Sequence, residues 1–116
     1  MLPGDHAWKE LNEDSFADQN LDRSDFTGAQ LRRADFWGAS LRDCVFCFAD
    51  LEDADLGLAD LAGADFTGAW LGGATVAAAN HLYAPGAFYG GREHWEPMRD
   101  LVADFCLLYT SDAADE

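Results

Sequence analysis

The chain has 116 residues, enough for one small domain, and it carries 22 acidic against 7 basic side chains for a formal net charge of −15. That balance argues against direct binding to nucleic acid or to an anionic membrane, because both need clustered basic residues. No run of 18 apolar residues could span a membrane, and three cysteines make no disulfide framework, so a cytoplasmic protein is expected.

The first predicted element is a short cap, residues 1–13, which precedes a repetitive region. It holds two large apolar residues, Trp8 and Leu11. The open end of a stack of coils exposes backbone pairing groups and needs a cover. We therefore expect residues 1–13 to lie over the first coil of the region that follows.

A repeat with a period of five dominates the next part of the chain. A small residue, most often Ala, stands two places before a large apolar residue, and Asp often stands directly before it. A period of five fits neither a helix nor a strand, so each unit must turn the chain by a fixed angle. Four units per coil predict a square solenoid with the small and the large residue inside. The predicted inward ladder is Phe16, Leu21, Phe26, Leu31, Phe36, Leu41, Phe46, Leu51, Leu56, Leu61, Phe66, Leu71 and Val76.

The charged residues favour four units per coil. Residues 20 apart would then be stacked neighbours about 4.8 Å apart, where opposite charges stabilise and like charges do not. Four such stacks combine opposite charges: Asp22 with Arg42, Arg23 with Asp43, Arg32 with Glu52, and Arg33 with Asp53.

The unit Ala-Asp-Leu/Phe-x-x, present over residues 14–78, resembles the pentapeptide-repeat family. The resemblance implies an all-β fold, a right-handed quadrilateral parallel β-helix. Thirteen units predict about three coils, and we assign residues 14–82 to this solenoid. The motif is highly specific for the fold and says almost nothing about function.

Three segments are expected after the solenoid. Pro85-Gly86 and Gly90-Gly91 mark residues 83–96 as a linker or cap. Pro97 suits the first position of an amphipathic α-helix over residues 97–105, with one apolar face (Met98, Leu101, Val102, Phe105). In the family such a helix caps the coil or builds a dimer, which implies a possible homodimer here. Residues 106–116 resemble a translated sequencing adapter, which implies a bacterial metagenomic fragment cut near Phe105.

No set of residues predicts catalysis, a cofactor or a metal. Cys44 and Cys47 form a lone C-x-x-C pair, but Cys44 takes the inward position and Cys47 points out, and zinc needs four ligands. The aspartates at the repeated outward position are predicted to hold turns rather than to act as catalytic carboxylates. These are Asp25, Asp35, Asp50, Asp55, Asp60 and Asp65. We therefore predict that the protein is not an enzyme.

Large apolar residues at outward positions predict a surface that binds a partner protein. The candidates are Trp37, Val45, Phe48, Leu58 and Trp70, with Cys47 beside them. The stretch from Asp43 to Val76 adds seven carboxylates and no basic residue. The alternative is that a flanking segment, residues 83–95, folds back and covers these side chains.

Three functions remain open from the sequence. The first is a non-enzymatic protein–protein interaction module. The second is implied by the family resemblance: some members mimic DNA and bind type II topoisomerases such as gyrase, which protects against quinolones. The acidic charge fits that function, but a rod of ~15 Å covers less than half of a ~34 Å duplex turn. The third is an appendage to a missing catalytic domain.

Overall fold

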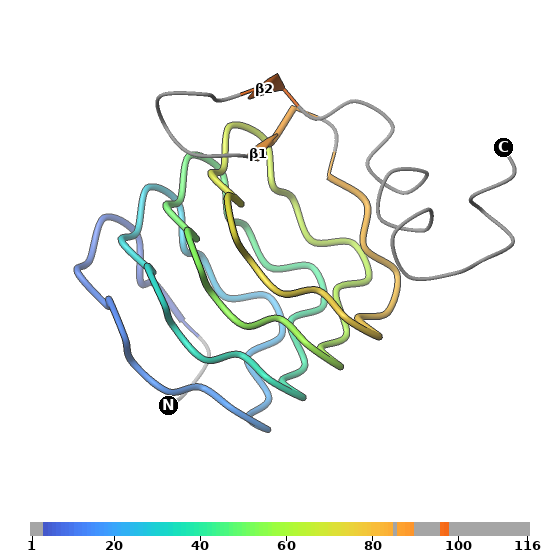
Figure 1. The fold of residues 1–116 in the computed structure, drawn as a ribbon. Coiled ribbons are helices and arrows are strands. Elements are labelled where there is room, and N and C mark those ends of the chain that lie inside the picture. Colours follow the sequence, from blue (N-terminus) through green and yellow to red (C-terminus); the bar gives the residue numbers. More distant parts are fainter. Residues whose placement is uncertain (1–3, 85, 90–95, 98–116) are drawn as a thin grey trace, which may run out of the picture.

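One turn, repeated in every pentapeptide, builds the fold. The computed structural model describes residues 4–84, 86–89 and 96–97, and its coils stack side by side along one axis (Figure 1). The residue two places after each inward residue has a positive φ of 56 to 76°. This holds in fifteen consecutive pentapeptide units, from Trp8 to Ala78. The next N–H donates to the carbonyl of the inward residue, as from Ala29 to Phe26 at 3.0 Å. Left-handed backbone at the third position and not at the second makes each of these a type II turn.

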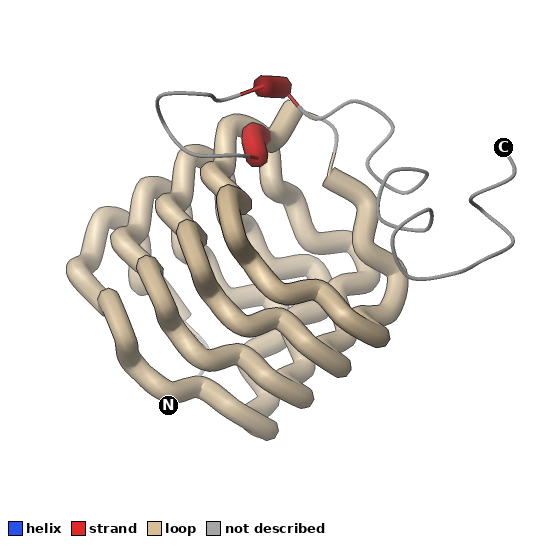
Figure 2. Tube along the Cα trace, viewed as in Figure 1, coloured by secondary structure: helices blue, strands red, loops and turns tan. Residues whose placement is uncertain are grey.

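Backbone hydrogen bonds then join each coil to the next. Parallel β-bridges run at every fifth position, from Asp5 with Asp25 to Asp60 with Asn80. The Phe26 N–H donates forward to the Val45 carbonyl at 2.7 Å, and the Val45 N–H donates back to the Ser24 carbonyl at 3.0 Å. Four units therefore make one coil, as the sequence predicts. Each side of the square is a single bridge, so the sides are drawn as loop in Figure 2.

The repeated aspartate completes the turn with its own side chain. The Asp25 Oδ1 accepts the Thr27 N–H at 2.9 Å, two places ahead in the chain. The same bond recurs at Asp5, Asn20, Asp35, Asp50, Asp55, Asp60 and Asp65. The predicted turn role of the six repeated aspartates is confirmed.

The core consists of stacked side chains, and all thirteen residues of the predicted inward ladder are at most 3% exposed. The Phe46 ring stacks on Phe26 at 5.1 Å and on Phe66 at 5.0 Å between centroids. Phe16 and Phe36 stack in a second ladder at 4.8 Å. The two ladders meet edge to face, with Phe36 and Phe46 centroids 5.9 Å apart. Aromatic pairs favour both arrangements.

The predicted cap over residues 1–13 is wrong for the part that the structure describes. Asp5 and Glu10 already bridge to the next coil, and His6 stacks on Phe26 at 5.0 Å in the inward position. Positions 5–13 are thus part of the solenoid. Because the bridges extend from Asp5 to Asn80, the solenoid has nearly four coils rather than about three. The polar His6 obscures the pattern, since it occupies a position that is apolar in later units.

The chain leaves the coil after residue 80. Leu82, Ala84 and Ala87 are buried, and the Gly68 N–H donates to the Gly86 carbonyl at 2.7 Å. Two short strands follow, β1 (Phe88–Tyr89) and β2 (Glu96–Pro97), paired antiparallel. Pro97 lies in β2 and not at the first position of a helix. The rest of the predicted helix, residues 98–105, and the tail 106–116 lie outside the described residues.

Candidate interaction surface

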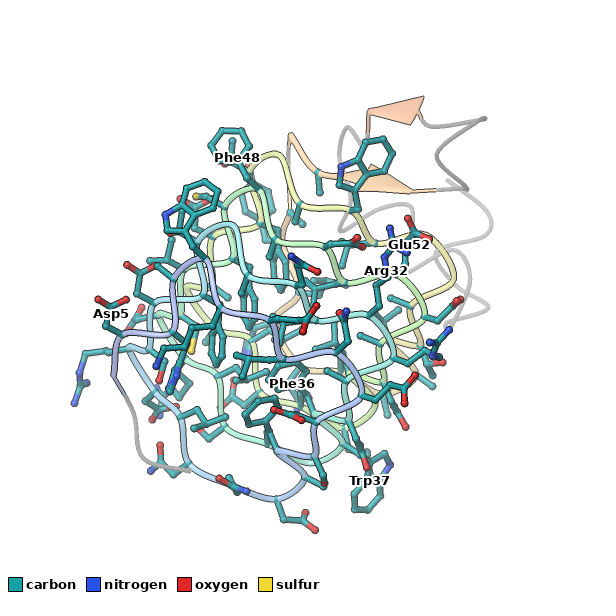
Figure 3. The ribbon with its side chains drawn as sticks, turned by 90° about the vertical axis from the view of Figure 1, so that its left-hand side faces the viewer. Asp5, Arg32, Phe36, Trp37, Phe48 and Glu52 are labelled. Atoms are coloured by element: carbon teal, nitrogen blue, oxygen red, sulfur yellow. The ribbon has the colours of Figure 1, made fainter. Side chains whose placement is uncertain are left out.

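The outward side chains fall on distinct edges of the square. We define the Phe48 edge by the equivalent outward positions of successive coils, each a bridge residue and the corner that follows it, which are 5, 7, 8, 25, 27, 28, 45, 47, 48, 65, 67 and 68. The Trp37 edge is defined in the same way by positions 15, 17, 18, 35, 37, 38, 55, 57, 58, 75, 77 and 78. These edges lie on opposite sides of the solenoid, as the labelled Phe48 and Trp37 show when the stack is viewed from its first coil (Figure 3).

Two exposed aromatic rings occupy the Phe48 edge. Trp8 is 71% exposed and Phe48 is 64% exposed. Both have left-handed backbone, at φ 64° and 60°. Each ring lies over a glycine of the next coil, because a Cβ on Gly28 would collide with the Trp8 ring and one on Gly68 with the Phe48 ring. The rings therefore rest against backbone and present their remaining surface to solvent.

The five predicted surface residues do not form one patch. Val45 and Phe48 share the Phe48 edge, although Val45 is only half-buried. Trp70 is half-buried on the adjacent side, where it bridges to Asp50. Trp37 and Leu58, 44% and 47% exposed, lie on the opposite edge. Val45 and Phe48 therefore lie on the opposite side of the solenoid from Trp37 and Leu58.

The residue pattern alone places Trp8 wrongly. Trp8 does not lie in a cap over the coil but at a corner of the first coil, two coils before Phe48. Counting back from Phe16 in steps of five would have found it, because His6 then takes an inward position and Trp8 the same corner position as Phe48.

Covering of the Phe48 edge by residues 83–95 is the alternative to a binding surface. Phe48 keeps its 64% exposure in the folded chain. Tyr83, at the start of that segment, is itself 60% exposed. Residues 85 and 90–95 lie outside the described part of the chain.

Two carboxylates on the Phe48 edge are held in the ionised form. Hydrogen bonds from the Thr27 hydroxyl, at 2.6 Å, and from the Thr27 N–H lower the pKa of Asp25. The Thr67 N–H and hydroxyl lower the pKa of Asp65 in the same way. Bonds to the charged form stabilise it, so both groups are anionic at neutral pH.

The arginine pairs differ from the four predicted stacks. Arg32 Nε contacts Asp50 Oδ2 at 2.7 Å and Arg42 Nε lies 3.8 Å from Asp60 Oδ2, so each reaches the turn-forming aspartate of the next coil. Arg33 pairs backwards with Glu13 at 2.6 Å. The predicted register holds for the backbone, whereas the side chains of Arg32 and Arg42 reach diagonally. The Arg42 N–H does donate to Asp22 Oδ1, its stacked neighbour, at 3.0 Å.

The cysteines lie as predicted from the repeat, with Cys44 buried and Cys47 half-buried. The Cys44 thiol donates to the Leu21 carbonyl at 3.1 Å, and burial raises the pKa of this thiol to about 11. Burial also raises the pKa of Cys47, next to Asp65. Among the described residues no group of three His, Cys, Asp or Glu side chains could hold a metal ion.

Cys44 is expected to react with iodoacetamide at pH 8 only when the coil opens. Its raised pKa leaves little thiolate, and the core excludes the reagent, so native labelling is expected to be roughly 100-fold slower than labelling in urea. Peptide mapping by mass spectrometry measures both rates. Equal rates in the native and unfolded protein would place Cys44 outside the core.

Fifteen type II turns, bridged from coil to coil around a stacked core, define a quadrilateral parallel β-helix, a solenoid repeat protein. The model of the family described as pentapeptide repeats matches residues 15–38 and 39–75, with eight copies. The chain belongs to the pentapeptide-repeat family, whose β-helix is right-handed, and the predicted resemblance is confirmed. Proteins of this family are generally structural repeat proteins without catalysis.

Solved structures of the family resemble the chain. A pentapeptide repeat protein from the thylakoid lumen of Arabidopsis thaliana is 30% identical, with a TM-score of 0.63 over 89% of this chain and 77% of that one. HetL, a pentapeptide repeat protein involved in heterocyst differentiation regulation in the cyanobacterium Nostoc, is 26% identical, with a TM-score of 0.57 over 72% of this chain. The match spans about half of HetL, 48%. No curated protein matches the sequence. No helix in the described ranges is long and apolar enough to cross a membrane.

Proposed function

We propose that this protein is a non-enzymatic protein–protein interaction module that binds its partner through the Phe48 edge. The observation that carries the proposal is the exposure of two large aromatic rings, Trp8 and Phe48, on the same edge. Buried aromatic side chains near the centre of an interface often dominate the binding energy. A partner that covers these rings removes a large apolar area from water.

The backbone at these positions supports the proposal. A left-handed conformation costs a residue with a Cβ roughly 1–2 kcal/mol, and glycine avoids this cost. Glycine fills the equivalent corner of the second and fourth coils, at Gly28 and Gly68. The turn sets the left-handed backbone at all fifteen corners and does not require a large side chain there, whereas a binding role accounts for the size and exposure of Trp8 and Phe48.

The test is selection of binders from a displayed random-peptide library on the immobilised wild-type protein. Selected peptides are expected to bind Phe48→Ser at least tenfold more weakly, because Phe48 is the more central of the two rings. Leu58→Ser is the matched control, since Leu58 has the same corner position and a similar φ of 57° on the opposite edge. Selected peptides that lose affinity only for Leu58→Ser, or for neither variant, would contradict the assignment.

Topoisomerase binding through DNA mimicry is a second candidate. What favours it is the regular array of turn-held carboxylates and a solenoid that begins at residue 5 rather than at residue 14. Nearly four coils at ~4.8 Å still give a rod of only ~18 Å, about half of a ~34 Å duplex turn. We therefore rank it second. Inhibition of gyrase supercoiling by the purified protein, retained in Phe48→Ser, would reverse this ranking.

A further inference from the structure

We propose that the segment bound by the Phe48 edge presents two arginine side chains, which pack on the Trp8 and Phe48 rings and pair with Asp25 and Asp65. This inference rests on the proposed function and specifies the chemistry of the partner. It derives from a duplicated local structure on that edge.

The same pentapeptide, Asp-Phe-Thr-Gly-Ala, occurs at residues 25–29 and again at residues 65–69. In each copy the glycine lies under an aromatic ring from the preceding coil, Trp8 over Gly28 and Phe48 over Gly68. In each copy the aspartate stands three places before that glycine, on the same edge. The edge therefore carries two equivalent subsites of ring plus carboxylate. They are two coils apart, or ~10 Å at ~4.8 Å a coil.

Each carboxylate has one oxygen engaged by the turn. The Asp25 Oδ1 accepts both bonds from Thr27, at 2.9 and 2.6 Å. The Asp65 Oδ1 accepts both bonds from Thr67, at 3.0 and 2.7 Å. The turn thereby fixes each carboxylate on the outer surface through Oδ1 and makes no bond to Oδ2, while the Cys47 thiol forms a further hydrogen bond to Asp65. A donor that contacts Oδ2 does not compete with the turn.

Arginine fits such a subsite better than lysine. The planar guanidinium stacks on an aromatic face and donates to a carboxylate from the same group, whereas an ammonium is a compact, strongly hydrated charge. Three ring atoms of Trp8 lie close to the place that a Cβ on Gly28 would occupy. The ring therefore covers the backbone at Gly28 with one of its faces.

The distribution of charge agrees with a cationic ligand. The outward positions of the Phe48 edge hold Asp5, Asp25 and Asp65 and no basic residue. The three arginines with ion pairs, at positions 32, 33 and 42, lie on the other two sides. Lys9 follows Trp8 in the chain and carries the same charge as the ligand. The Phe48–Asp65 subsite is therefore expected to bind arginine more tightly than the Trp8–Asp25 subsite.

The Trp37 edge provides an internal control with the same number of aspartates but, among its described positions, a single exposed aromatic ring, Trp37. It also holds three aspartates, Asp18, Asp35 and Asp55, and no basic residue. Asp35 and Asp55 form the same turn bond as Asp25 and Asp65, at 3.0 and 2.9 Å. Asparagine keeps that bond, as Asn20 does at 3.1 Å. Aspartate-to-asparagine changes on either edge thus remove charge and preserve the turn.

The test is the affinity of a fluorescein-labelled peptide, Gly-Gly-Arg-Gly-Gly-Arg-Gly-Gly amide, measured by anisotropy on the full chain. In the polyproline II conformation its two arginines lie on the same side of the peptide, ~9 Å apart. The double variant D25N/D65N and the variant Phe48→Ser are each expected to lose at least fivefold in affinity. D35N/D55N is expected to lose less than twofold. A peptide with citrulline in place of arginine is expected not to bind the wild-type protein.

Three outcomes would overturn the inference: equal losses in the two double variants, equal binding of the citrulline peptide, or no binding of the arginine peptide. The citrulline comparison uses only the wild-type protein, so it does not depend on the folding of any variant. The proposed function is tested by a different experiment, the selection from the peptide library. Library peptides that need Phe48 but carry no arginine would support the Phe48 edge as a binding surface and exclude arginine as its ligand.

Discussion

Replacing Phe46 with alanine is expected to lower the free energy of unfolding by about 3–5 kcal/mol. Phe46 is fully buried and stacks on Phe26 and Phe66 at 5.1 and 5.0 Å. Removal of the ring leaves a cavity in the middle of a ladder, and both neighbouring rings lose their stacking partner. Urea denaturation followed by circular dichroism measures the change.

Phe48→Ala is the control for Phe46→Ala, because it removes the same atoms from a nearby side chain that is 64% exposed. We expect the control to change the unfolding free energy by less than ~1 kcal/mol. Equal urea midpoints for Phe46→Ala and wild type would contradict a packed phenylalanine ladder.

Duplicating one whole coil is expected to stabilise the protein. A second copy of residues 21–40, inserted after residue 40, adds four units and keeps every bridge in register. Glycines 28 and 38 recur in the new coil, so the crowded corners stay open. The stability of a solenoid is approximately a sum of units and their interfaces. Each 1 kcal/mol gained raises the Tm of a domain of this size by roughly 4–8 °C.

Insertion of a shorter second copy, residues 21–38 alone, is the matched variant. It adds nearly the same sequence but displaces every later inward residue by two positions relative to its ladder. We expect this variant to lose cooperative unfolding. Differential scanning calorimetry compares the two insertions, and the same Tm for both would contradict a coil of four pentapeptide units.

The inward ladder could be predicted because every fifth residue from Phe16 to Val76 is large and apolar, whereas the outward positions hold mixed residue types. Phe26, Phe46 and Phe66 recur once per coil and stack in the structure, as the period requires. The role of the repeated aspartate could be predicted for a similar reason. A carboxylate next to an inward residue is well placed to accept the N–H two places ahead.

The first coil could be predicted only by counting units back from Phe16, because it departs from the residue types that define the repeat. His6 replaces a large apolar residue at the inward position, and Lys9 replaces alanine two places before Leu11. Backbone geometry at Trp8 is nevertheless the same as at later corners, with φ 64°. The backbone keeps its period in the first coil, although the residue types there no longer follow the repeat.

The ion pairs of Arg32 and Arg42 could not be predicted from stacking alone. Arg33, in contrast, pairs with Glu13, its stacked neighbour 20 positions away. Stacking from coil to coil describes the backbone, whereas a long side chain at a corner points diagonally. Arg32 accordingly contacts Asp50, although Glu52 is its stacked neighbour. Outward residues close in sequence, such as Phe48 and Leu58, also lie on opposite edges. An edge is defined by position within the coil, and not by distance along the chain.

The most direct test of the Phe48 edge is hydroxyl-radical footprinting of the wild-type protein, with and without a peptide selected from the library. Bound peptide is expected to protect Trp8 and Phe48 from oxidation at least threefold and to leave Trp37 and Leu58 unchanged, because the latter pair lies across the solenoid. Protection of Trp37 and Leu58, with Trp8 and Phe48 oxidised as in the free protein, would contradict the assignment of the Phe48 edge as the interaction surface.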